Sequence, residues 1–224
     1  MNKTELELKE PEKRKPMNLE RIAFALILAS LTFVLGFMIS YTVSYTQYKS
    51  IQDLQDNMKY DLLSVQIEKS LVGNSCTLFN PYRFSSEMSD MGFTIDLLEK
   101  RFGKNDEKVI EKKKIYSLLE VQHFLYINDY RKNCNKSMHT ILFFYSNEEN
   151  DIGQGELFGR ILNYVKTTNK NVMIYSFDYN LDDPLINTLK KKYNIIQPNT
   201  ILIDENVKLT SIKNSEEVSF YIDK

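Results

Sequence analysis

The longest apolar stretch of the chain, residues 22–48, contains no charged residue. Ile22–Ile39 is mainly apolar, and the remainder is rich in Tyr, Thr and Ser. About 20 mainly apolar residues cross a bilayer as a helix, and tyrosines suit its far boundary. The pattern predicts a transmembrane helix over residues 22–46. A cleaved signal peptide and a buried helix of a soluble protein are the competing interpretations, but Thr42-Val43-Ser44 is a poor cleavage site.

Basic residues are distributed unevenly around this segment. The leader over residues 1–21 contains Lys3, Lys9, Lys13, Arg14, Lys15 and Arg21, whereas the other flank has only Lys49 and Lys59 nearby. Because basic flanks stay on the cytoplasmic side, we expect a cytoplasmic leader and an outward C-terminal part in a protein that crosses the cell membrane once. Residues 1–18 are charged and short of large apolar groups, which predicts disorder.

A helical spacer is predicted over residues 47–138. Its first helix has apolar residues three or four positions apart, at Ile51, Leu54, Met58, Leu62 and Val65. Polar residues interrupt this stripe when it is continued, so packing on the helix's own domain is favoured over a coiled-coil stalk. Weak homo-oligomerisation through residues 47–72 is the alternative.

Two further helices are expected in the spacer, over residues 86–102 and from Asn105 to about Asn133. His123 lies on the apolar face of the second of them. It is predicted to be a hydrogen-bonded core residue, because no paired acid or nucleophile lies within helical reach. The run Lys112–Lys114 is predicted to be a solvated face, with contact to anionic lipid or to another partner as the alternative.

From residue 139 onward, buried strands alternate with helices. The strands are expected over residues 140–145, 172–177, 200–204 and 207–212, and the last helix over residues 216–222. Asp183-Pro184 is a helix cap followed by a first-turn proline, and Glu205-Asn206 is a hairpin turn. The order strand-helix-strand-helix-strand-strand-helix predicts an α/β domain over residues 139–224 whose first two strands are parallel neighbours.

The segment Lys192-Tyr193-Asn194-Ile195, followed by Thr200-Ile201-Leu202-Ile203, is similar to a pattern of the thioredoxin-like superfamily. In that family Tyr-Gly/Asn-Val/Ile precedes Pro-Thr and an apolar strand. The resemblance covers about residues 139–222 and implies the minimal thioredoxin-like fold. The whole layout resembles membrane-anchored thioredoxin-like proteins of prokaryotes, of archaeal type, in which a helical spacer joins the anchor to the fold.

Two departures from the family change the expected function. The family's dithiol aligns with a segment that has no cysteine, namely Glu148, Glu149, Asn150, Asp151 and Ile152. The family's cis-proline aligns with Asn199, between Pro198 and Thr200, and a trans loop of altered shape is expected because a cis bond before a non-proline residue costs about 2.5–4 kcal/mol. Carboxylates cannot perform thiol exchange, so the resemblance implies a degenerate active site.

Several acidic residues are expected at the edge of the sheet where the first two strands end. The rim consists of Glu148, Glu149, Asp151, Asp178, Asp182 and Asp183. One hypothesis is a docking surface for a cation or a basic partner. The interpretation we favour is that Asp151 and Asp183 cap helices while the other side chains face solvent.

The chain has two cysteines, Cys76 and Cys134, which are not in a CxxC motif. On the outward side of a membrane they are expected to form a structural disulfide. By loop entropy such a bond contributes roughly 4 kcal/mol. Buried free thiols and a redox-active pair are the alternatives.

Composition narrows the function further. The net charge is −1 and no basic stripe is interleaved with aromatic residues, so nucleic acid is not an expected partner. The cysteines and the two histidines lack the spacing of a zinc site, and no metal or cofactor is predicted. We expect a non-catalytic binding or scaffold module that contacts the lipid bilayer and a protein partner outside the cell. The alternative is a thiol-disulfide oxidoreductase that uses Cys76 and Cys134.

Overall fold

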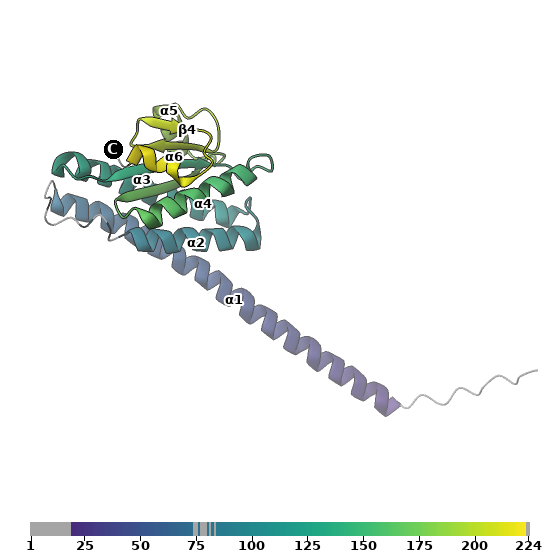
Figure 1. Cartoon of the computed structure of the whole chain (residues 1–224). Helices are drawn as coiled ribbons and strands as arrows, with labels where there is room; N and C mark the ends of the chain where they lie inside the picture. The colour runs from purple at the N-terminus through teal and green to yellow at the C-terminus, as the bar shows by residue number, and fades with distance from the viewer. Residues whose placement is uncertain (1–18, 74–75, 77–79, 81, 83, 223–224) are drawn as a thin grey trace, which may run out of the picture. The chain divides into compact units, whose positions relative to one another are not determined.

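The computed structural model describes residues 19–73, 76, 80, 82 and 84–222, and the chain divides into two units, Met1–Ile51 and Gln52–Lys224 (Figure 1). The disorder predicted over residues 1–18 lies outside the described residues. The first unit contributes the N-terminal part of helix α1, Leu19–Val72. The second contains the rest of α1, five more helices and a four-stranded sheet among the residues that the structure describes.

The membrane segment and the first spacer helix, predicted as separate elements, form one continuous helix. Leu19–Thr46 is apolar and, at about 1.5 Å per residue, roughly 42 Å long, which is enough to cross a bilayer. Its side chains are exposed throughout. The sequence therefore located an apolar helix of spanning length correctly, although the helix begins three residues before Ile22.

The spacer part of α1 packs against its own unit. Met58 and Val65 are fully buried in the larger hydrophobic core, and Leu54 and Leu62 pack against that core from its edge. These are residues of the predicted helical stripe, so the expectation that the helix packs on its own domain is confirmed for them.

Helices α2, Ser85–Phe102, and α3, Glu107–Cys134, form the rest of the spacer and lie within two residues of their predicted bounds. The Asp106 side chain caps α3 by accepting hydrogen bonds from two backbone amides of the first turn. His123 is 1 % exposed and its Nδ1 lies 2.9 Å from the Tyr175 hydroxyl, which confirms a hydrogen-bonded core histidine.

The prediction of a solvated lysine face on α3 was wrong. Lys112 and Lys113 are 3 % and 5 % exposed. Helix α3 is the central helix of the unit and is buried on more than one side, so positions opposite its apolar stripe are also covered. The cost of burying Lys113 is offset by its ion pairs with Glu99 and Asp178.

Four strands form a mixed sheet in the order β2-β1-β3-β4. Their bounds are His139–Tyr145 for β1, Val172–Asp178 for β2, Thr200–Ile203 for β3 and Val207–Leu209 for β4. Strands β1 and β2 are parallel, as predicted, whereas β3 runs antiparallel to both β1 and β4. Strand β4 ends three residues before the predicted position 212.

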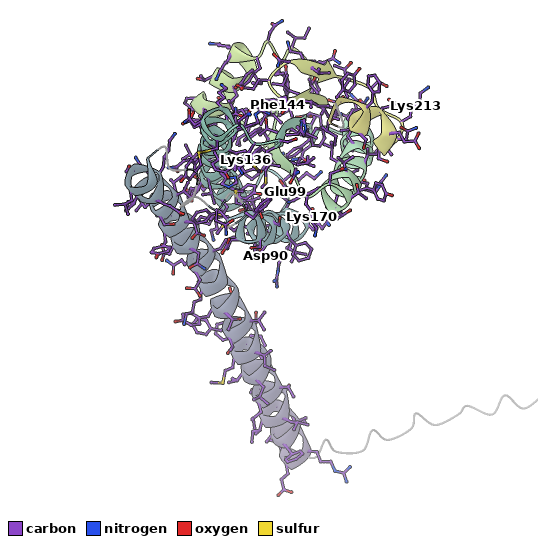
Figure 2. All side chains as sticks on the ribbon, turned by 60° about the vertical axis from the view of Figure 1, so that its left-hand side comes forward. Asp90, Glu99, Lys136, Phe144, Lys170 and Lys213 are labelled. Carbon is purple, nitrogen blue, oxygen red and sulfur yellow. A yellow bond between two sulfur atoms is a disulfide. The ribbon has the colours of Figure 1, made fainter. Side chains whose placement is uncertain are left out.

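Helices cover both faces of this sheet (Figure 1). Their bounds are Ile152–Thr168 for α4, Pro184–Lys192 for α5 and Ser215–Ile222 for α6. Alternate residues of β1 point to opposite faces: Ile141 and Phe143 pack in the core under α4 and α6, while Leu142 and Phe144 belong to the core under α3 and α5. Figure 2 shows Phe144 inside the fold and Lys213 projecting from its surface.

Candidate functional site

The loop between β1 and α4 occupies the position where the sequence predicts a degenerate dithiol. Glu148, Glu149 and Asn150 are exposed, Asp151 stands before the first turn of α4, and Ile152 begins that helix. No thiol is present in this loop, and its side chains are carboxylates, an amide and an alkyl group. The loop therefore offers no nucleophile for thiol exchange.

Asn199 fixes this loop to the start of β3. Its side chain is buried, its Nδ2 donates to the Asp151 carbonyl at 2.8 Å, and its Oδ1 accepts from the Ser146 amide at 3.2 Å. Its φ is +52°, a left-handed conformation that asparagine tolerates better than most residues. The peptide bond before it is trans, as are the others in the described part of the chain.

Helix α4 approaches Asn199 closely at Gly155. A Cβ at this position would lie 3.0 Å from Asn199 Oδ1 and 3.4 Å from the Ser146 carbonyl oxygen. Pro198 is half-buried beside this contact, and Thr200 is buried where β3 begins. The loop of Pro198, Asn199 and Thr200 therefore acts as a rigid connection, in which an amide side chain supplies two backbone hydrogen bonds.

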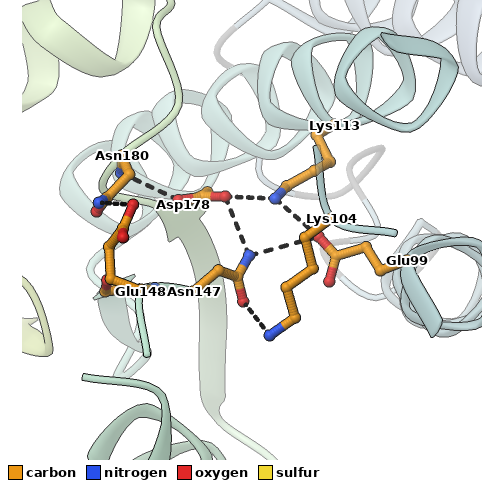
Figure 3. A network of polar contacts seen from close by, with 8 residues as sticks. Glu99, Lys104, Lys113, Asn147, Glu148, Asp178 and Asn180 are labelled. Carbon is orange, nitrogen blue, oxygen red and sulfur yellow. Dashed lines mark hydrogen bonds and ion pairs between the residues drawn. The ribbon is translucent and has the colours of Figure 1, made fainter. Parts of the chain in front are cut away.

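A buried polar network covers the carboxyl ends of β1 and β2 (Figure 3). Lys113 of α3 forms ion pairs with Glu99 of α2, at 2.7 Å, and with Asp178 at the end of β2. Asn147 donates to Asp178 at 3.2 Å and accepts from Lys104 at 3.0 Å. The side chains of Lys113, Glu99 and Asp178 are 5 %, 11 % and 9 % exposed, so this network anchors the spacer helices to the sheet.

The six acids predicted to share a rim do not have one common environment. Glu149 and Asp182 are exposed, as expected, and Asp183 caps α5 by accepting from the amides of Leu185 and Ile186. Glu148, also exposed, accepts from Asn180 Nδ2 at 3.1 Å.

Two of these acids differ from the interpretation that we favoured. Asp151 stands at the N-cap position of α4 but makes no capping hydrogen bond through its side chain. Asp178 does not face solvent, because it is buried against Lys113. Within the described residues, no three His, Cys, Asp or Glu side chains are arranged to hold a metal ion.

Cys76 and Cys134 form a disulfide, with their Cα atoms 5.6 Å apart. The bond joins the segment that follows α1 to the end of α3. Cys134 lies shortly before β1 begins, whereas the degenerate dithiol loop follows the other end of β1. The sulfur atoms are therefore distant along the strand from the loop that would carry the family's chemistry.

A second polar cluster lies at the amino end of β1. Asp204 forms an ion pair with Arg131 of α3, lies 2.6 Å from His139 Nδ1, and accepts from the Thr140 amide at 2.9 Å. This cluster ties the end of α3 to the turn between β3 and β4. Every member has a partner within the cluster, which fits a structural role.

A cavity of about 670 Å³ lies between the spacer helices and the sheet. Its walls come from α2, the first half of α3, the ends of β1 and β2, and α4. Ile152 of the degenerate dithiol region forms part of its lining, together with Ser146 and Asn147 before that region and Gly155 after it. Small-molecule sites typically enclose about 300–1,000 Å³, so the volume suits a small ligand.

The cavity contains one acidic residue with unusual surroundings. Glu120 of α3 is 3 % exposed; its Oε1 accepts from the Ser176 amide at 3.0 Å, and its Oε2 has no hydrogen-bond partner within the described structure. Burial raises the pKa of Glu120 to about 8, against the opposing effects of the Ser176 amide, the Tyr116 hydroxyl and the Lys166 charge. Near neutral pH this carboxyl group is therefore largely protonated.

Sequence reasoning missed both Glu120 and the Lys113 network. Glu120 and Lys113 both lie on α3, where Leu119-Glu120-Val121 and the lysine run give no sign of burial. The order of elements was the signal that could have found them: α3 stands between a second helix and buried strands, and a helix in a central position is covered on several sides.

Comparison of the chain with protein-family models, with curated proteins and with solved structures finds no match.

Proposed function

We propose that this chain is a single-pass membrane protein whose outward unit is a thioredoxin-like domain that binds rather than catalyses. Residues 19–46 serve as the anchor in this proposal. The excess of basic residues before them supports a cytoplasmic N-terminus and an outward position for the residues from about 47 onward.

Element order and strand pairing support the thioredoxin-like part of the proposal. From β1 to α6 the elements follow the order strand-helix-strand-helix-strand-strand-helix, with β1 and β2 parallel and β3 and β4 antiparallel to their neighbours. Tyr193-Asn194-Ile195 directly follows α5, and Thr200 begins β3, as in the resemblance to the family.

The non-catalytic part of the proposal rests on the absence of a thiol from the loop between β1 and α4. The loop at Glu148–Ile152 has no thiol, and the chain's two cysteines are joined to each other elsewhere. Thiol exchange needs an accessible thiolate or a labile disulfide. The cavity beside the loop, together with the fixed Asn199 connection, supports a binding role for the same edge of the sheet.

A disulfide-exchange assay on the purified full chain tests this function. The account predicts that the chain reduces or oxidises a dithiol substrate no faster than buffer, and that Cys76→Ser/Cys134→Ser gives the same background rate. Wild-type exchange above background that disappears in the double variant would overturn the proposal and favour the oxidoreductase alternative. A thioredoxin with an intact dithiol serves as the positive control.

A further inference from the structure

The cavity places two ionisable side chains with unmet bonding capacity against the same space. Glu120 Oε2 has no hydrogen-bond partner among the described residues. Lys166 of α4 also lines the cavity; it is half-buried, its Nζ donates to Ser89 Oγ at 2.9 Å, and no acid in the described structure forms an ion pair with it. Burial lowers the pKa of Lys166, although the nearby Glu120 acts in the opposite direction.

Most other charges that line the cavity already form ion pairs, and Lys104, at the end next to Asn147, donates a hydrogen bond to the Asn147 side-chain oxygen at 3.0 Å. Lys113 is shared by Glu99 and Asp178, and Lys100 pairs with Asp96 at 2.6 Å near the solvent. Buried charges in proteins are normally paired. With Glu120 protonated, Lys166 is the charge that lacks a counter-ion at this end of the cavity.

We infer that the cavity binds a small organic carboxylate with an apolar body, whose carboxylate group lies between Lys166 and Glu120. The inference rests on the proposed function, because it names a ligand class for the same binding edge. The ligand's oxygens accept hydrogen bonds from the Lys166 ammonium group and from the protonated Glu120 carboxyl group. Charge-assisted bonds of this kind are among the stronger hydrogen bonds in proteins.

The rest of the lining fits the apolar body of such a ligand. Phe143, Leu162 and Ile174 contribute apolar walls next to the polar end. Apolar walls with a few polar groups that fix orientation are typical of small-molecule sites.

Water alone satisfies these groups less completely. A second hollow of about 20 Å³, lined by Glu120, Tyr116 and Lys166 among others, has room for about one water molecule. That water can bond to Glu120 Oε2, but it leaves Lys166 without an anion. An ammonium ligand would add a second cation beside Lys166, whereas a carboxylate balances the charge.

Binding is expected to depend on the protonation of Glu120. The titratable groups that face Glu120 are Tyr116 of its own helix, Tyr145 of β1, Tyr175 of β2 and Lys166 of α4. Helix α2 adds three charged residues to the cavity wall, and each of them is already in an ion pair: Asp96, Glu99 and Lys100. Burial raises the pKa of all three tyrosines well above the usual value, so they stay neutral while Glu120 titrates. Above about pH 8 an ionised Glu120 repels a ligand carboxylate.

Calorimetric titration of the full chain in zwitterionic nanodiscs tests the inference, with empty nanodiscs as the blank. The probes are 3-phenylpropionate, 3-phenylpropanamide and 3-phenylpropylammonium, which share one apolar body. The carboxylate is expected to bind about tenfold or more tightly than either analogue, since one charge-assisted bond is worth about that factor. Equal affinities, a preference for the ammonium probe, or no binding of the carboxylate would overturn the inference.

Variants locate the site within the chain. Lys166→Met is expected to weaken 3-phenylpropionate binding about tenfold or more, while Lys166→Arg retains it. Lys170→Met, at an exposed position beyond the end of α4 (Figure 2), is the matched control and leaves the affinity unchanged. Glu120→Gln keeps a hydrogen-bond donor and should bind the probe without the loss of affinity above pH 8.

Unchanged affinity in a folded Lys166→Met variant would overturn the assignment, as would a pH profile of Glu120→Gln that matches the wild type. Circular dichroism establishes that each variant is folded. The ligand test and the exchange assay can contradict their two proposals independently of each other. A chain that binds no carboxylate and exchanges no disulfides loses the ligand class but keeps its non-catalytic function.

Discussion

Lys113→Met is expected to lower the free energy of unfolding by about 3–5 kcal/mol, the usual cost of removing one partner from a buried ion pair. Lys113 is the cation shared by Glu99 and Asp178, all of them largely buried at the carboxyl ends of β1 and β2 (Figure 3). Methionine keeps most of the side-chain volume, so the loss arises from two carboxylates left without their cation. Urea unfolding of the full chain, followed by circular dichroism, measures the difference.

Two controls separate charge from packing in this experiment. Lys114→Met removes a half-buried lysine that forms no ion pair in the described structure, and it should change stability by less than about 0.5 kcal/mol. Adding Glu99→Gln and Asp178→Asn to Lys113→Met should recover part of the loss, because the carboxylates are then neutralised. If Lys113→Met unfolds at the wild-type urea concentration, the network does not anchor the spacer helices.

The stability of the wild-type protein is expected to fall as pH rises from about 4.5 to about 8, the range in which Glu120 is protonated in the folded state but ionised in the unfolded chain. The folded state keeps the carboxyl neutral up to about pH 8, while the unfolded chain ionises it near the ordinary value of 4.5. Because the pKa is raised in the folded state, the contribution of Glu120 to the free energy of unfolding is complete below pH 4.5. It is lost progressively as the pH approaches 8. At about 1.36 kcal/mol per pKa unit, the loss amounts to roughly 4–5 kcal/mol.

Glu120→Gln isolates this effect, because glutamine keeps the acceptor for the Ser176 amide and does not ionise. The difference between the wild-type and variant unfolding energies should therefore change by several kcal/mol between pH 4.5 and 8, with the variant favoured at the higher pH. Glu111→Gln, at an exposed position of the same helix, is the matched control and should follow the wild-type profile. Parallel profiles for Glu120→Gln and the wild type would show that the Glu120 carboxyl is not kept neutral by burial.

Much of the architecture could be predicted because it depends on local pattern. The apolar runs of β1 and β2, the stripe of α2 and the Asp183-Pro184 start of α5 each indicate their elements without reference to distant residues. Strand β4 was predicted too long because the run from Val207 ends on the apolar Ile212, whereas the pairing with β3 ends at Leu209. Ile212 is buried under the helices of that face rather than in a strand.

The candidate site could not be predicted in the same way, because its groups meet only in three dimensions. Glu99, Lys113 and Asp178 are far apart in sequence and come from α2, α3 and β2. Each reads as an ordinary surface charge in its own segment. The same holds for Glu120 and Lys166, whose shared cavity depends on how the spacer helices lie against the sheet. Asn199 was identified from its alignment with the family's proline, but its two backbone hydrogen bonds required the folded loop.

The thiol state of Cys76 and Cys134 in intact membranes tests the central claim most directly. Membrane-impermeant alkylation with and without reductant, followed by mass spectrometry, distinguishes bonded from free cysteines. The account predicts one intramolecular disulfide that resists alkylation until reductant is added from outside, which agrees with an outward domain in a disulfide-permitting compartment. Two free thiols that are alkylated rapidly without reductant would contradict the structural role of the disulfide and would favour the oxidoreductase alternative.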